Sequence, residues 1–157
     1  VLQASIGFNK WNGIPLDAFG GLVPFKENRD VLGILFLSSF LSGRAPEGGA
    51  LLSVFMGGVR RPELVDLPDE DIKAILAREV MSMTGLKEFK PDMLKITRYE
   101  HAIPQYGITT GERLETVNRL QTQFPGLIIG GNLRNGIGMS DRIKQGREIA
   151  ETIRVGE

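Results

Sequence analysis

The first half of the chain has the residue pattern of β-strands. Leu2, Ala4 and Ile6 alternate with Gln3 and Ser5, and this period of two predicts a strand that is already under way at the first residue. Three further apolar runs, each bounded by glycine, proline or charged residues, predict strands over 19–25, 31–40 and 50–56. Together they predict a curved sheet, antiparallel or mixed, in which the longest run is buried on both faces or lines an apolar cavity.

The second half changes to a helical period. Three acidic residues from Asp69 to Asp71 suit a helix start, and apolar residues then recur at helical spacing, which predicts a helix over 69–84. An alternating run predicts a strand over 94–99. A second amphipathic helix is predicted over 111–124, because its apolar residues share one side and Pro125 follows its end.

The chain closes on a strand, a glycine-rich loop and a helix. Residues 127–129 are predicted to form a short buried strand, 130–138 the loop, and the helix opens near Ser140. Its inner face is predicted to consist of Ile143, Gly146, Ala150 and Ile153. This order of elements builds cofactor sites in α/β proteins, because a helix N-terminus favours negative groups. The fingerprint G-x-G-x-x-G is broken at Asp141, so the pattern alone is equally typical of an ordinary tight turn.

The composition excludes several classes of chemistry. Among the 157 residues, 19 basic side chains balance 19 acidic ones, so no nucleic-acid partner is expected. Without cysteine and with one histidine, no metal site is predicted, and His101 is expected to be structural rather than a general base. No catalytic side chain stands out. The unusual count is 20 glycines, several of them paired beside apolar runs, where they favour turns, bulges or close backbone approach.

Several ordered motifs resemble the FAD-dependent amine-oxidase superfamily, and most closely its porphyrinogen-oxidising members. They are 19–24 (FGGLVP), 32–33 with 38–39, 44–46 with Gly48, 55–58, 102–106 (AIPQY), 125–132, 135–138 and 141–146. The resemblance implies an α+β or α/β fold. A mixed β-sheet of a substrate-binding domain with packed helices would occupy 1–124. The final strand, glycine loop and helix of an FAD-binding Rossmann-like domain would occupy 125–157.

The cofactor that this resemblance implies is FAD. The glycine loop would direct backbone N–H groups at the flavin, where they stabilise the negative charge that develops when the ring accepts a hydride. The implied cofactor-binding residues are Gly131, Asn132, Gly136, Ile137, Gly138 and Asp141. Two roles remain open for the Asp141 carboxylate, a helix cap or a hydrogen bond near the flavin.

The implied substrate is a porphyrinogen, protoporphyrinogen IX or coproporphyrinogen III, which is a large and mostly apolar macrocycle. The resemblance implies that the substrate-binding residues are Leu16, Leu32, Leu52, Gln105 and Tyr106. From the residues alone, the three leucines would be ordinary members of a core.

The family's N-terminal G-x-G-x-x-G motif has no counterpart in this sequence, and the chain starts without methionine. The chain is therefore expected to be the C-terminal third of such an enzyme, inactive by itself and without bound FAD. A homo-oligomer is expected from unpaired strand edges, and a location in the cytoplasm or at the periphery of a membrane is implied. The alternatives are another flavin oxidoreductase, such as an amine oxidase or a carotenoid desaturase, and a non-catalytic porphyrin-binding or interaction module.

Overall fold

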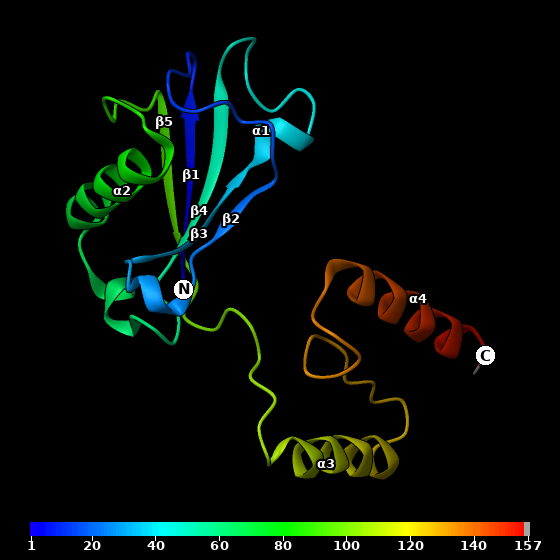
Figure 1. Ribbon diagram of the computed structural model, residues 1–157. Coiled ribbons are helices and arrows are strands. Elements are labelled where there is room, and N and C mark those ends of the chain that lie inside the picture. Colours follow the sequence, from blue (N-terminus) through cyan, green and yellow to red (C-terminus); the bar gives the residue numbers. More distant parts are fainter. Residues whose placement is uncertain (156–157) are drawn as a thin grey trace. The chain divides into compact units, whose positions relative to one another are not determined.

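A computed structural model describes residues 1–155 of the chain (Figure 1). These residues form two compact units, Val1–Glu100 and His101–Glu157, and each unit is described by itself. The first contains the sheet and one long helix, and the second contains two helices joined by an irregular segment. This division follows packing, so the predicted boundary between functional domains at 124 and 125 stays a prediction.

A five-stranded antiparallel sheet forms the centre of the first unit. Its strands are β1 (Leu2–Phe8), β2 (Gly20–Leu22), β3 (Val31–Phe36), β4 (Ala50–Met56) and β5 (Met93–Arg98). They lie in the order β2-β3-β4-β1-β5, and every pairing is antiparallel. Of the two sheets that the sequence leaves open, antiparallel and mixed, the structure therefore has the antiparallel one.

One face of this sheet is covered by α2 (Asp69–Thr84), whose bounds coincide with the predicted helix (Figure 1). The helix presents Ile72, Leu76 and Val80 to the core, and all three are fully buried. Opposite them lie the alternate residues of the central strands, which share a face because they pair directly across β1 and β4. These core residues are Leu2, Ala4, Ile6, Ala50, Leu52, Val54 and Met56. The period of two along β1 is thus confirmed as a buried face.

Two of the predicted strands are shorter than their apolar runs. In the run over 31–40, the strand ends at Phe36, and the next four residues form the one-turn helix α1 (Leu37–Phe40). The Leu41 N–H donates to the Leu37 carbonyl at the end of this helix. The Ser38 hydroxyl accepts a hydrogen bond from the Leu51 N–H, which keeps this turn beside β4. The run over 19–25 has only three residues in β2, because Pro24 follows and Phe25 begins the 3-10 helix η1 (Phe25–Glu27).

A bulge interrupts the ladder between β3 and β4. Val31 pairs with Met56 and Gly33 with Phe55, so Leu32 is an extra residue without a partner across the strand. Bulges turn a side chain away from its regular direction and are common next to functional sites. After β4, the 3-10 helix η2 (Pro62–Asp66) leads into α2.

The second unit contains α3 (Thr110–Gln123) and α4 (Met139–Val155). The strand predicted over 127–129 is absent, since residues 127–130 form no ladder, and Leu127 and Ile128 are exposed. A strand needs a neighbour to satisfy its backbone, and here the Ile129 N–H donates instead to the Gln121 side chain at 2.8 Å.

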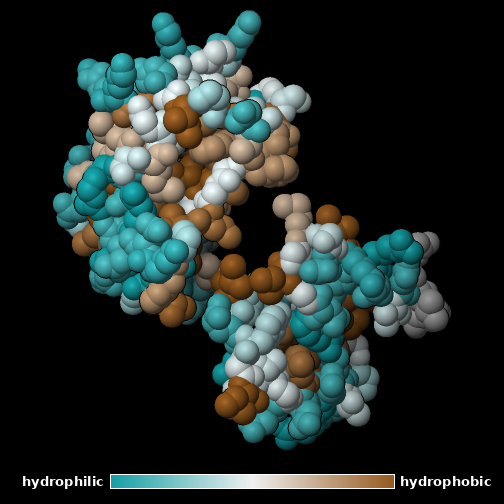
Figure 2. Space-filling model, viewed as in Figure 1, coloured by the Kyte–Doolittle hydropathy of each residue, from teal (hydrophilic) through white to brown (hydrophobic). Residues whose placement is uncertain are grey.

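The face of α4 that was predicted to be inward is also exposed, with Ile143 69% and Ile153 55% accessible. The residue of α4 that is buried is Gln145, which faces the glycine loop. The space-filling view shows hydrophobic residues among the hydrophilic ones on the visible face (Figure 2). The exposed apolar side chains of this unit include Ile103, Ile108 and Met139. Within the described residues of this unit, Val117 is the buried apolar side chain.

Candidate functional site

The glycine loop joins α4 through a backbone cap. Gly138 immediately precedes α4 and its carbonyl accepts from the Arg142 N–H, so it occupies the N-cap position. The Asp141 carboxylate turns back and accepts a hydrogen bond from the Gly138 N–H at 3.1 Å, which is one half of a capping box. The capping role of Asp141 is therefore confirmed, and its negative charge also lies at the favourable end of the helix dipole.

Glycine is required in this loop for space as well as conformation. Gly136 has φ 92°, and a Cβ on it would lie 2.2 Å from the Asp141 carboxylate. A Cβ on Gly138 would approach the same carboxylate to 3.0 Å. The loop is thus closed tightly against the start of α4, with its backbone exposed where side chains would otherwise cover it.

Two polar side chains of α4 that the sequence analysis did not single out, Arg142 and Gln145, hold one side of the loop in place. Arg142 donates to the Gly131 carbonyl, to the Arg134 carbonyl at 2.8 Å and to the Asn135 carbonyl at 3.1 Å. Gln145 accepts from the Gly131 N–H at 2.7 Å. No local sequence pattern marks Arg142 and Gln145, because their partners are backbone groups of the loop.

Arg134 fastens the other side of the loop to α3. Its guanidinium donates to the Ile129 carbonyl at 3.1 Å and to the side chains of Asn118 and Gln121 at 3.3 Å each. The Nε atoms of Arg134 and Arg142 are both buried without a hydrogen-bond partner among the described residues. In each arginine the terminal nitrogens donate hydrogen bonds that hold the loop, while the buried Nε–H has no partner among the described residues.

The predicted cofactor and substrate segments meet at one hydrogen bond in the second unit. The Tyr106 hydroxyl donates to the Asn132 carbonyl at 2.8 Å, although the two residues are 26 positions apart. Gln105 is exposed and its amide lies 3.4 Å from the Ile103 carbonyl, which is a weak local contact. Two other predicted cofactor residues flank Asn132 in the sequence of the loop. Gly131 precedes it with φ 116°, and Ile137 follows it with a side chain that is 44% exposed.

The three predicted substrate leucines do not share one surface in the first unit. Leu52 is 0% exposed and lies in the core between β4 and α2, so no described part of it is open to a ligand. Leu32 is the half-buried bulge residue, and a Cβ on Gly58 would lie 3.6 Å from its Cδ1. Leu16 lines a separate cavity.

That cavity has a volume of about 390 Å³ and lies where β1 ends and β4 begins. Its walls come from four short segments: Trp11 with Leu16, Ser38 with Ser39, 43–46, and Gly48 with Gly49. Tertiary structure brings together here the Ser38-Ser39, Arg44-Ala45-Pro46 and Gly48 motifs that the sequence analysis noted separately.

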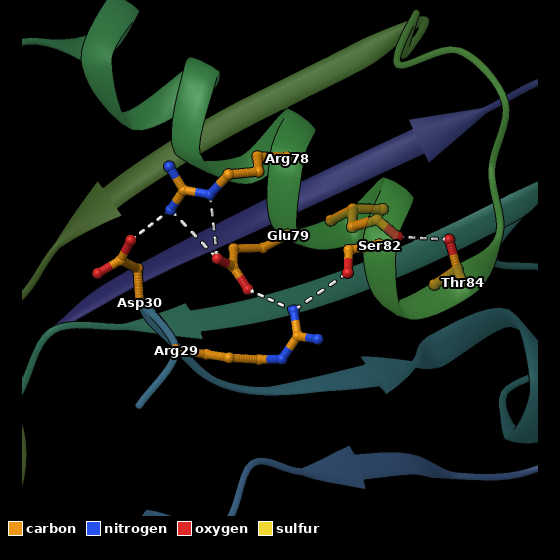
Figure 3. A network of polar contacts seen from close by, with 7 residues as sticks. Arg29, Asp30, Arg78, Glu79, Ser82 and Thr84 are labelled. Carbon is orange, nitrogen blue, oxygen red and sulfur yellow. Dashed lines mark hydrogen bonds and ion pairs between the residues drawn. The ribbon is translucent and has the colours of Figure 1, made fainter. Parts of the chain in front are cut away.

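A charged network ties α2 to the segment before β3 (Figure 3). Glu79 has a side chain only 7% exposed, accepts from Arg29 at 3.0 Å and also pairs with Arg78 at 3.1 Å. Asp30 pairs with Arg78 and, at 3.3 Å, with Arg61. The pKa of the Arg78 guanidinium is raised above its ordinary value, chiefly by the hydrogen bond to Glu79 and further by the charge of Asp30. Three arginines thus surround two carboxylates in this network.

The described residues contain neither a membrane-spanning helix nor a metal-binding cluster. None of the helices that they form combines the length and apolar content needed to cross a membrane. Within the same part of the chain, no three His, Asp or Glu side chains are grouped so as to hold a metal ion.

The fold and the glycine loop belong to a class of flavin-dependent oxidoreductases. The family model described as flavin containing amine oxidoreductase matches residues 1–154, and the chain is a member of this family. Within the family, the chain is similar to proteins named protoporphyrinogen oxidase and coproporphyrinogen III oxidase. It is 30% identical over 142 residues to the mitochondrial protoporphyrinogen oxidase of Nicotiana tabacum, a match that covers 88% of this chain and 28% of that protein.

Bacterial relatives extend this similarity. The coproporphyrinogen III oxidase of Propionibacterium freudenreichii is 31% identical over 124 residues, which cover 78% of this chain and 23% of that enzyme. The corresponding enzyme of Bacillus subtilis is 33% identical over 107 residues, covering 66% and 22% respectively. The chain therefore spans about a quarter of the length of these relatives.

Solved structures share the fold at lower identity. A crystal structure from Exiguobacterium sp. 255-15, assigned to protoporphyrinogen oxidase, superposes with a TM-score of 0.81 at 19% identity, over 99% of this chain and 34% of that one. Reduced UDP-galactopyranose mutase superposes with a TM-score of 0.73 at 13% identity, over 98% of this chain and 34% of that one. At these identities the likeness shows the fold alone.

Proposed function

We propose that this chain is the C-terminal part of an FAD-dependent oxidase that converts a porphyrinogen, protoporphyrinogen IX or coproporphyrinogen III, to the porphyrin in haem biosynthesis. The observation that carries this proposal is the loop of residues 130–138, closed by Asp141 and Arg142 onto the start of α4. Membership of the flavin family and the names of the relatives support the reaction class.

The residues present fit a flavin at this loop. Gly136 and Gly138 leave backbone uncovered at the N-terminus of α4, where a Cβ would collide with Asp141. We infer that Gly131, Asn132, Gly136, Ile137 and Gly138 line the cofactor. When bound, FAD supplies the oxidising power, since it accepts a hydride from the substrate. The chain's own contribution is a fixed set of N–H dipoles that favours negative charge beside the loop.

Asp141 acts on this site through the loop rather than by contact. Its carboxylate is committed to the Gly138 N–H, so it holds the loop closed and aims the neighbouring N–H groups. Tyr106, bonded to the Asn132 carbonyl, would place the 102–106 segment beside the loop and so form part of the active-site wall together with Gln105.

For the macrocycle, we propose contacts from Leu32, the half-buried bulge residue beside Gly58, and from Leu16, which lies in the separate cavity beside Trp11. Leucine side chains bury an apolar ring without competing polar groups. Leu52 is fully buried in the core, so its proposed part is to support β4 from within.

We further propose that the chain by itself is inactive and retains no FAD. The second unit buries a single apolar side chain among its described residues, so the hydrogen-bonded loop has little apolar core beneath it in this chain alone. We also propose a homo-oligomer, or a protein of the cytoplasm that contacts a membrane at its periphery. Two features favour this: β2 is an edge strand, and beside it lie the exposed side chains of Phe19, Leu22 and Phe25.

Oxidation of both porphyrinogens, followed by porphyrin fluorescence, tests this function. The protein encoded by the whole reading frame should turn over at least one of them and show flavin absorbance, and the 157-residue chain should do neither. A whole protein that is flavin-loaded and inert toward both porphyrinogens would contradict the substrate, and flavin retained by the short chain would contradict its inactivity.

A matched pair of glycine variants tests the loop. In the whole protein, Gly136→Ala should lower the flavin content, because its Cβ collides with Asp141, whereas Gly146→Ala meets nothing within 4 Å and should leave the flavin content unchanged. Equal flavin content in both variants would argue that the flavin does not depend on this loop.

One other flavin chemistry has a specific observation in its favour. The mutase shares this fold with a TM-score of 0.73, so the fold accommodates substrates other than porphyrinogens. A flavin-loaded whole protein that fails with porphyrinogens would shift the proposal to a different oxidoreductase of the family.

A further inference from the structure

The cavity beside Trp11 combines one charged group with two hydroxyls and an apolar wall. Among the residues that line it, Arg44 is the charged one, and its guanidinium has neither an ion pair nor a hydrogen bond within the described part of the chain. The acidic neighbours in sequence, Asp17 and Glu47, do not line the cavity. The lining therefore carries an uncompensated positive charge.

Two hydroxyls add hydrogen-bond donors to this charge. Ser38 Oγ accepts from the Leu51 N–H at 3.0 Å, so its own O–H remains available as a donor. Ser39, also in the lining, has no hydrogen bond from its side chain within residues 1–155. The guanidinium and the two hydroxyls together offer several donors, and no carboxylate of the described residues lines the cavity, which is an arrangement that favours an anion.

The rest of the lining is mainly apolar, and several contacts hold its tryptophan in place. The Trp11 ring meets Phe8 edge to face at 5.3 Å, its Nε1–H donates to the Ile14 carbonyl at 2.7 Å, and its backbone N–H donates to the Gly48 carbonyl. Leu16, Ala45 and Pro46 complete this wall.

The loop over 43–49 is built into this position. Gly43 and Gly48 have positive φ, at 71° and 72°, and the Gly49 N–H closes a turn onto the Pro46 carbonyl at 2.9 Å. A Cβ on Gly49 would lie 2.5 Å from the Phe8 carbonyl oxygen. The cavity wall is thus a defined loop packed on the end of β1, rather than an open stretch of chain.

We infer that this cavity binds a carboxylate attached to an apolar body. The planar guanidinium of Arg44 matches the two oxygens of a carboxylate, and a single cation balances its single charge better than the double charge of a phosphate monoester. A volume of about 390 Å³ is at the small end of ligand pockets, so it holds a small acid or one acidic side chain of a larger ligand.

The chain has one tryptophan, and this makes a direct test available. The indole N–H signal of Trp11 in a ¹⁵N–¹H spectrum of the 157-residue protein is followed while 4-phenylbutyrate is added. A saturable shift is expected. The uncharged 4-phenylbutanamide should bind about tenfold more weakly, because it lacks the charge-assisted bonds. Equal binding of acid and amide, or no shift at all, would overturn the inference.

Variants locate the charge. Arg44→Gln should weaken 4-phenylbutyrate by about tenfold, and Ser39→Ala should weaken it to a smaller extent. Arg113→Gln, which removes an exposed arginine of α3, is the matched control and should bind as the unaltered chain does. An Arg44→Gln protein with a native spectrum and unchanged affinity would exclude the site, and tighter binding of phenyl phosphate would replace the carboxylate as its ligand.

Such a carboxylate could belong to the porphyrin substrate or to a separate small acid. A competition measurement distinguishes these two sources. Coproporphyrin III carries acidic side chains on an apolar ring, and displacement of 4-phenylbutyrate by it would make the cavity a subsite of the substrate, an assignment that rests on the proposed function. Binding of both without competition would assign the cavity to a separate small acid. The effect of Arg44→Gln on the affinity for 4-phenylbutyrate tests the cavity in either case, even if the whole protein does not oxidise porphyrinogens.

Discussion

Glu79 on α2 and Arg29 before β3 are 50 residues apart and joined by a hydrogen bond of 3.0 Å. Arg29 lies two residues before Val31, the first residue of β3, and three before the bulge at Leu32. The hydrogen bond to Glu79 therefore fixes the start of β3 against α2 (Figure 3). The Glu79 side chain is 7% exposed and accepts from two arginines, which makes it the buried centre of the network.

We predict that Glu79→Gln lowers the free energy of unfolding by about 1–2 kcal/mol. The amide keeps the shape but removes the negative charge that Arg29 and Arg78 share, and the partial exposure of both arginines limits the loss below that of a fully buried pair. Urea unfolding at neutral pH, followed by circular dichroism, measures this.

The control for that substitution lies on the same helix. Glu70 is 86% exposed and its ion pair with Lys73 spans 3.9 Å, so Glu70→Gln should change stability by less than about 0.5 kcal/mol. Equal effects of the two substitutions would mean that the network adds nothing beyond ordinary surface charge.

Leu52→Ala should destabilise the first unit by about 2–5 kcal/mol, because it empties a fully buried position between β4 and α2. Leu22→Ala, at a residue 85% exposed, should change stability by no more than about 0.5 kcal/mol. Thermal unfolding compares the two. A stable Leu52→Ala protein that has lost porphyrin affinity would instead give Leu52 a binding role.

Two glycine substitutions should act in opposite directions. Gly49→Ala is expected to cost about 1–3 kcal/mol, because its Cβ would lie 2.5 Å from the Phe8 carbonyl oxygen. Gly146→Ala, inside α4 with nothing within 4 Å, should stabilise that helix by about 0.5–1 kcal/mol. Global unfolding measures the first change, and amide exchange within α4 measures the second; protection of α4 that falls in Gly146→Ala would contradict the open position of this residue.

Arg142→Met should speed amide hydrogen exchange in the glycine loop by about tenfold, since it removes the donors to the Gly131, Arg134 and Asn135 carbonyls. Exchange is read by mass spectrometry on peptides covering 130–138. Arg147→Met is the control, because Arg147 is 79% exposed and bonds only along its own helix. A loop that exchanges equally in both variants would show that Arg142 does not hold it.

Most element ranges could be predicted from the sequence because they depend on residues close together in the chain. The helix over 69–84 has an acidic start, an apolar face and Gly85 at its end, and all three signals are local. The strand over 50–56 likewise follows from one apolar run between glycine turns. The glycine loop was recognised for the same reason, and the cap by Asp141 spans only three residues.

The errors occur where a distant partner decides. The apolar run at 127–129 has the composition of a strand, but no neighbouring strand lies beside it in the described residues, so its backbone bonds to Gln121 instead. The inner face of α4 was predicted from apolar spacing, whereas Arg142 and Gln145 turn toward the loop to satisfy its carbonyl and N–H groups.

By itself, the sequence determined most of the strands and helices, the glycine loop and the family, because periodicity and ordered motifs are properties of neighbouring residues. Tertiary structure alone decided that Leu52 belongs to the core, that Arg142 and Arg134 hold the loop, and that Trp11, Ser39 and Arg44 line one cavity. These relationships depend on how β1, β4 and the helices pack, and contacts between residues far apart in the chain leave no local pattern.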